Sequence, residues 1–179
     1  MNMKKGIALL CALLLLACVP VLAEEVPEMN WADVGNDELM AQGEFQKIQI
    51  EGMPAIAYWV PSIMASVDVS GIEGAFKPAA LYATEDQSNS IALFSFEIAG
   101  LEDYLTMIEQ QGGGSDFQNV KVNGVDCVAY QVEADNMECL VYPITENLIL
   151  SFSFAPANGD EGWDAVKAVI VASIQPLAE

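Results

Sequence analysis

The sequence predicts an α+β fold, a twisted antiparallel sheet covered by helices in an α/β/α sandwich. Three observations lead to this prediction. Short segments of alternating apolar residues follow one another, as in antiparallel strands. Asn123-Gly124 lies between two β-branched runs and is typical of a tight hairpin turn. Two stretches with apolar residues at helical spacing, near residue 105 and at the C-terminus, would cover the sheet.

The first elements are short. Residues 24–29 form a charged, proline-containing leader that we expect to be mobile. A helix is predicted from Asn30, a good N-cap, but Gly35 weakens it. Residues 62–66 are predicted to form a helical turn. Strands are predicted at 44–51, 55–60, 79–83 and 90–98.

The second half predicts a helix, a series of hairpins and a closing helix. In residues 101–111 apolar side chains recur at i, i+3, i+4 and i+7, and Gly112 ends the helix. Hairpins follow, with turns at Asn123-Gly124, at 133–136 and at 145–147. The last helix begins after the acidic segment 158–161, and Pro176 stops it. We expect one domain over residues 30–176.

The N-terminus predicts export. Lys4 and Lys5 precede about a dozen apolar residues, which is too short for a membrane span but suits a signal peptide. Cleavage after Ala23 would remove residues 1–23 and start the mature chain at Glu24. Alternatively, residues 15–18 (LLAC) act as a lipobox, and Cys18 becomes lipidated. The protein is then secreted in the first case and membrane-anchored in the second.

Composition excludes several functions. After removal of Lys4 and Lys5, four lysines face 26 acidic residues, so the mature net charge is −22. Nucleic-acid binding is excluded, because it needs a basic surface. Since the sequence has no His and no Arg, it also lacks imidazole catalysis and bidentate anion clamps. No nucleotide-binding motif occurs, so we expect no cofactor.

The acidic residues do not predict a metal site. They cluster at residues 33–38 and 160–161, but neither cluster has the spacing of a calcium loop. Solubility of an exported protein explains them more simply. We therefore expect no catalytic, cofactor-binding or metal-ligating residue.

Cys127 and Cys139 are the two cysteines of the mature chain and lie on strands predicted to be neighbours. A loop of three or five residues between the strands would place them opposite each other, and a disulfide would then form. A four-residue loop would place them on opposite faces of the sheet as buried free thiols. We expect the disulfide on the assumption of a bulge near residues 133–136.

The pattern resembles the PsbP/Mog1/LpqN-like family of small α/β/α sandwich domains, and especially its uncharacterised exported bacterial members. The residues that carry the resemblance are Trp31-Ala-Asp, Ala57-Tyr-Trp-Val-Pro61, the helix LEDYLTMIEQQG, the hairpin VNGVDCVAY and FSFAP before the last helix. Because known relatives are mostly non-enzymatic, the resemblance implies a binding or accessory domain. It carries across no functional residue.

We therefore expect an exported, non-catalytic domain that binds an envelope or extracellular protein or a small ligand. It would contact a membrane only if Cys18 is lipidated. The alternative is a hydrolase that uses two carboxylates across a cleft outside the cytoplasm. A further hypothesis places an adaptable apolar groove at Met53, Met64, Met107 and Met137.

Overall fold

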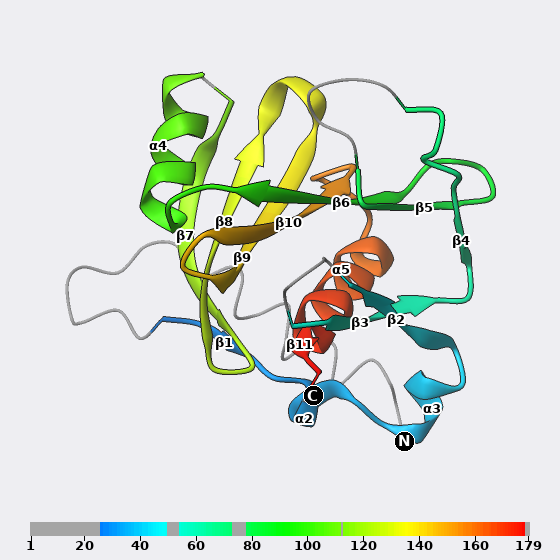
Figure 1. Cartoon of the computed structure of the whole chain (residues 1–179). Helices are drawn as coiled ribbons and strands as arrows, with labels where there is room; N and C mark the ends of the chain where they lie inside the picture. Colours follow the sequence, from blue (N-terminus) through cyan, green and yellow to red (C-terminus); the bar gives the residue numbers. More distant parts are fainter. Residues whose placement is uncertain (1–25, 50–53, 73–77, 112, 178–179) are drawn as a thin grey trace.

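A computed structural model describes residues 26–49, 54–72, 78–111 and 113–177 (Figure 1). These residues form two sheets and four α-helices, and the predicted α+β fold class is confirmed. Residues 1–25 lie outside the described part, so the predicted signal peptide and Cys18 are not tested by the structure.

The larger sheet has eight strands, and all neighbours are antiparallel except the parallel pair of β1 and β7. Its spatial order is β1 (Glu28–Met29), β7 (Ser115–Val122), β8 (Val125–Val132), β9 (Met137–Thr145), β10 (Leu148–Ala155), β6 (Ser90–Glu97), β5 (Ala80–Thr84) and β4 (Met64–Ser66).

The smaller sheet has three antiparallel strands in the order β11 (Gln175–Pro176), β3 (Ile56–Pro61) and β2 (Gly43–Ile48). The helices are α2 (Trp31–Val34), α3 (Asp37–Met40), α4 (Leu101–Gln110) and α5 (Glu161–Ser173), and a 3-10 turn, η1, spans Glu133–Asp135.

Each face of the larger sheet is covered by a different layer. In β10, Phe152 belongs to the main core, which it shares with Tyr58 of the smaller sheet and Ile170 of α5. Ile149, three residues earlier, points the other way and packs in a second cluster with Tyr104 of α4. Figure 1 shows α5 and the smaller sheet on one side and α4 on the other. The side chains of β10 therefore alternate between the two layers.

Three local predictions need correction. Glu28 and Met29 were expected in a mobile leader, but they pair with β7 as β1. Residues 62–66 do not form a helical turn, because Met64–Ser66 pair with β5 as β4. The predicted N-terminal helix is divided at Gly35 into α2 and α3, as the weakness of glycine in helices suggested.

The Asn123-Gly124 turn connects three distant parts of the chain. Both residues have positive φ, 47° and 81°, as a type I′ turn requires. The Asn123 side chain accepts a hydrogen bond from the Trp31 backbone N–H at 2.9 Å, at the start of α2. It also donates to the carbonyls of Ala172 and Ile174, both at 2.8 Å, at the end of α5. The Asn123 amide thus supplies hydrogen-bond partners to backbone groups at the start of α2 and at the end of α5 that have none within their own helix.

Lys167 joins α5 to the neighbouring sheet. Its ammonium group lies 2.6 Å from Glu138 Oε2 of β9 and 3.1 Å from Asp164 Oδ1, and it donates to the Ala157 carbonyl at 2.6 Å. Lys167 is buried, and three oxygen acceptors compensate its charge, as a buried cation requires. The described pair Lys121–Asp126 is much more exposed and contributes little to stability.

Replacing Asn123 by glycine should destabilise the fold by about 2–3 kcal/mol. Glycine keeps the positive φ but loses three hydrogen bonds of about 1 kcal/mol each. Asn136→Gly is the matched control, because Asn136 also has positive φ, 50°, and no hydrogen bond of its side chain is recorded among the described residues. Urea unfolding should show a change within about 0.5 kcal/mol for the control. Equal losses in both variants would contradict the bridging role of Asn123.

Candidate functional site

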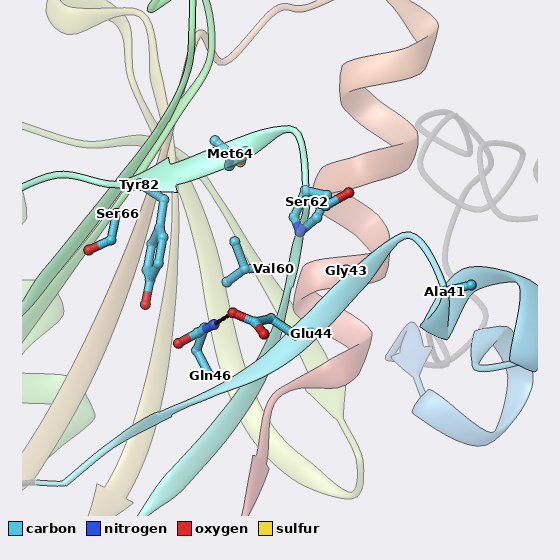
Figure 2. A pocket seen from close by; sticks show the side chains of 10 residues that line it. Ala41, Gly43, Glu44, Gln46, Val60, Ser62, Met64, Ser66 and Tyr82 are labelled. Carbon is cyan, nitrogen blue, oxygen red and sulfur yellow. Dashed lines mark hydrogen bonds between the residues drawn. The ribbon is translucent and has the colours of Figure 1, made fainter.

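A cleft of about 470 Å³ lies between the small sheet and strand β4 (Figure 2). Its volume falls within the range of roughly 300–1,000 Å³ that is common for ligand sites. The apolar part of its described lining comes from Val60, Pro61 and Met64, with Ala41 and Gly43 at the β2 side. The polar part comes from Glu44, Gln46, Ser62, Ser66 and Tyr82.

The cleft forms because the chain changes sheets at Pro61. Pro61 is the last residue of β3, and three residues later the chain enters β4 of the larger sheet. Ser62 fixes this crossing, since its backbone N–H and its hydroxyl both donate to the Gln42 carbonyl, at 2.8 and 3.0 Å. The outer strands of the two sheets therefore border one space.

Two side-chain pairs set the polarity of the cleft. Gln46 donates a 2.6 Å hydrogen bond to the Glu44 carboxylate, which orients that carboxylate within the cleft. The hydroxyl groups of Tyr82 and Tyr58 lie 3.0 Å apart. Burial, reinforced by Tyr82, raises the pKa of Tyr58, so its hydroxyl group stays neutral. Glu44 is the one charged side chain among the described residues that line the cleft.

Strand β2 presents an unpaired edge. The Ser62 N–H donates to the Gln42 carbonyl. In an antiparallel ladder the backbone groups of every second residue form such hydrogen bonds, so from Gln42 onward alternate residues of β2 are hydrogen-bonded to β3. Trp59 lies opposite Phe45, and its N–H points away from β2 and donates to Ser173 Oγ at 2.7 Å, which agrees with this alternation of hydrogen bonds. The backbone groups that point away from β3 are those of Gly43, Phe45 and Lys47. No described strand pairs with this edge.

Strand β4 ends the larger sheet in the same way. Val67 N–H donates to the Leu81 carbonyl at 2.8 Å, and Thr84 N–H points toward β6 and donates to the Asn89 carbonyl at 3.0 Å. By alternation, the backbone groups of Met64 and Ser66 point away from β5. Both residues line the cleft, so a second unpaired edge borders it.

A wider hollow of about 1,040 Å³ lies against β4 and the β5–β6 turn, and its lining includes Ile63, Glu85 and Asp86. Asp86 accepts hydrogen bonds from Thr84 Oγ1 at 2.7 Å and from Ser88 N and Oγ at 3.1 and 2.8 Å. These bonds lower the pKa of Asp86 to about 2. The surface beside the cleft therefore keeps its negative charge in mild acid.

The acidic clusters singled out in the sequence have structural roles. Asn36 caps α3 by accepting from the Leu39 N–H at 2.9 Å, and Asp160 caps α5 by accepting from the Trp163 N–H at 2.9 Å. Within the described ranges, no group of three or more acidic, cysteine or histidine side chains could hold a metal ion.

The expected disulfide between Cys127 and Cys139 is wrong. Val132 pairs with Met137 across a four-residue connection, in which η1 is followed by Asn136 with positive φ. This register pairs Tyr130 with Cys139. Cys127 consequently lies in the main core and Cys139 in the cluster under α4, on opposite faces of the sheet. Both are buried free thiols, which is the alternative that the sequence left open.

The tryptophans and methionines mainly serve packing. Trp59 is buried and lies against the backbone of Gly43, where a Cβ atom would collide with the indole. Trp163 is buried and donates to the Pro156 carbonyl. Met64 belongs to the main core and Met107 packs against the second cluster, so they do not form one groove. Met53 lies outside the described residues.

Sequence reasoning missed the cleft residues Glu44, Gln46 and Tyr82. They are ordinary residue types on two strands, β2 and β5, and no motif links them. The alternation of Glu44, Gln46 and Ile48 was a usable signal, because it places two polar groups on the face that also carries Ile48.

None of the helices in the described ranges has both the length and the apolar character needed to cross a bilayer.

No protein-family model matches the sequence, and no curated protein matches it. Similar solved structures include the following two. Cyanobacterial PsbP (CyanoP) from Synechocystis sp. PCC 6803 aligns with a TM-score of 0.49 and 13% identity, over 74% of this chain and 92% of that chain. A protein from Bacteroides thetaiotaomicron VPI-5482 aligns with a TM-score of 0.42 and 16% identity, over 69% of this chain and 46% of that chain. Both likenesses concern the fold alone.

Protein that starts at Glu24 should contain two free thiols per chain when titrated in denaturant without reductant. In the native protein both should react very slowly, because burial raises the pKa of Cys127 to about 12 and also raises that of Cys139. A thiol reagent with and without denaturant measures both states. Absence of titratable thiols in the denatured chain would show a disulfide and contradict the strand register.

Proposed function

We propose that this protein is an extracytoplasmic, non-catalytic binding domain whose ligand occupies the cleft between β2 and β4. The observation that carries the proposal is the composition of that cleft. It combines an apolar wall, several hydrogen-bonding side chains and two unpaired sheet edges with a single charged group, Glu44, among its described lining residues. Its hydroxyl groups belong to Ser62, Ser66 and Tyr82, and no hydrogen bond among the described residues joins any of them to Glu44. No nucleophile is therefore paired with a base in the described lining.

The hydrolase alternative receives less support. A carboxylate hydrolase needs two acids on opposite sides of the bound substrate. Glu44 has no second carboxylate facing it among the described lining residues of the cleft. Asp86, in the neighbouring hollow, is held ionised by three hydrogen bonds and is therefore a poor proton donor.

Cysteine chemistry is also disfavoured. Cys127 and Cys139 are buried, and their raised pKa values keep them as thiols at neutral pH. The sequence contains no His or Arg to stabilise a thiolate. Neither cysteine lines the cleft.

The extracytoplasmic location rests on the N-terminal sequence. The basic start, the short apolar run and Ala23 before Glu24 together favour a cleaved signal peptide. The excess of acidic residues suits a protein that remains dispersed outside the cell.

Intact-mass analysis of protein recovered outside the cytoplasm should find Glu24 as the first residue. Signal-peptide cleavage after Ala23 produces this mass. A diacylglyceryl group on Cys18 would instead identify a membrane-anchored lipoprotein and contradict the secreted form. Uncleaved chain confined to the cytoplasm would contradict the proposed location altogether.

Purified processed protein should release no product from peptidoglycan or from mixed extracellular polysaccharides, as measured by mass spectrometry of the soluble fraction. The absence of an opposed carboxylate pair is the physical reason. Glu44→Gln is the matched control. Product formed by the unaltered protein and abolished in Glu44→Gln would establish the hydrolase and overturn the non-catalytic proposal.

A further inference from the structure

We infer that the occupant of the cleft is an extended peptide segment with a lysine or arginine side chain, which adds to β2 as a new strand. This inference rests on the proposed function and names the class of ligand. It is carried by three features of one place in the fold, namely the open edge of β2, the second open edge of β4 and the oriented carboxylate of Glu44.

The backbone of β2 provides the main binding groups. The N–H and C=O groups of Gly43, Phe45 and Lys47 point away from β3, and no described strand satisfies them. An extended peptide alongside β2 would pair with these groups as in an antiparallel or parallel ladder. Gly43 lines the cleft, so the ladder begins inside it.

Strand β4 supplies the opposite wall. Met64 and Ser66 direct their backbone groups away from β5, and both line the cleft across from β2 (Figure 2). Figure 2 shows Met64 and Ser66 on β4 above the side chains of Glu44 and Gln46, which come from β2. A peptide on β2 would therefore be enclosed by a second strand, which distinguishes this edge from one that faces open solvent.

The side chains select a cation. Glu44 and Gln46 lie on the face of β2 that lines the cleft, and Gln46 holds the carboxylate at 2.6 Å. A residue of an added strand opposite Glu44 would have its Cβ atom about 5 Å away, within reach of a salt bridge. No described lining residue of the cleft is basic. Lys47 points to the opposite face of β2, so it does not form an ion pair with the Glu44 carboxylate.

The charge of the protein argues against a second copy as the occupant. Each mature chain has a net charge of −22, so two chains repel each other. The ionised Asp86 in the neighbouring hollow adds to this repulsion. The same field attracts a basic peptide and strengthens its binding at low salt.

The test uses the whole processed protein, which starts at Glu24. Two capped peptides serve as probes, in which threonine and valine alternate around a central lysine in one and a central glutamate in the other. Backbone amide signals are followed by NMR during titration at low salt. We expect the lysine peptide to shift the Phe45 and Lys47 amide signals and to slow their hydrogen exchange. The glutamate peptide should bind more weakly.

Two substitutions test the two parts of the inference. Glu44→Gln should weaken binding of the lysine peptide about threefold and should not weaken binding of the glutamate peptide. Lys47→Pro should abolish the protection of β2, because proline removes an outward donor while the bonds to β3 remain. Lys47→Ala is its matched control and should bind the lysine peptide at least as well as the unaltered protein.

Several results would overturn the inference. They are shifts confined to elements other than β2 and β4, equal affinity for the two peptides, and β2 shifts that depend on protein concentration without peptide, which would indicate self-pairing. Absence of binding at millimolar peptide would overturn it as well. The proposed function is tested separately, since it fails on catalytic turnover or cytoplasmic retention, whatever the peptides do.

Discussion

The fold depends on the side-chain amide of Asn123 at the tip of the β7–β8 hairpin. That amide holds the first backbone N–H of α2 and two carbonyls at the end of α5. The chain after α2 leads to β2, and the chain after α5 becomes β11, which pairs with β3. The hairpin of the larger sheet thus fixes both approaches to the smaller sheet. Since β2 forms one wall of the cleft, this amide also determines where that wall lies relative to the larger sheet.

Because lysines are few, the position of each described lysine decides which carboxylates have an ion-pair partner. Residues 24–179 contain four lysines, and Lys167 contacts Glu138, Asp164 and a backbone carbonyl. Lys121 pairs with Asp126 at the surface. The described lining of the cleft therefore contains Glu44 and no basic residue. The buried ion pairs of Lys167 and a cleft carboxylate with no described ion pair both follow from this composition. Lysines are few, and the described ones do not line the cleft.

Elements governed by local physics were predictable from the sequence. The Asn123-Gly124 turn, α4 and α5 follow from backbone conformation, capping and periodicity within a few residues. Strand β4 was not predictable, because a segment of only three residues becomes a strand only by pairing with β5. The cysteines were misplaced since one residue of loop length reverses every side chain in a strand. The cleft was missed because Glu44 and Tyr82 line the same space only after the chain has passed from one sheet to the other.

The two open edges follow from one event in the chain. Pro61 ends β3 opposite Gly43, at a position where its missing N–H costs no bond to β2. The chain then joins the larger sheet as β4. Strand β2 is the last strand of the smaller sheet and β4 is the last strand of the larger one, and no described strand covers either edge. Exposed edges promote aggregation unless charge opposes it. Here the acidic surface supplies that opposition between copies of the protein. For the basic extended peptide that we infer as the occupant of the cleft, the same charge is attractive.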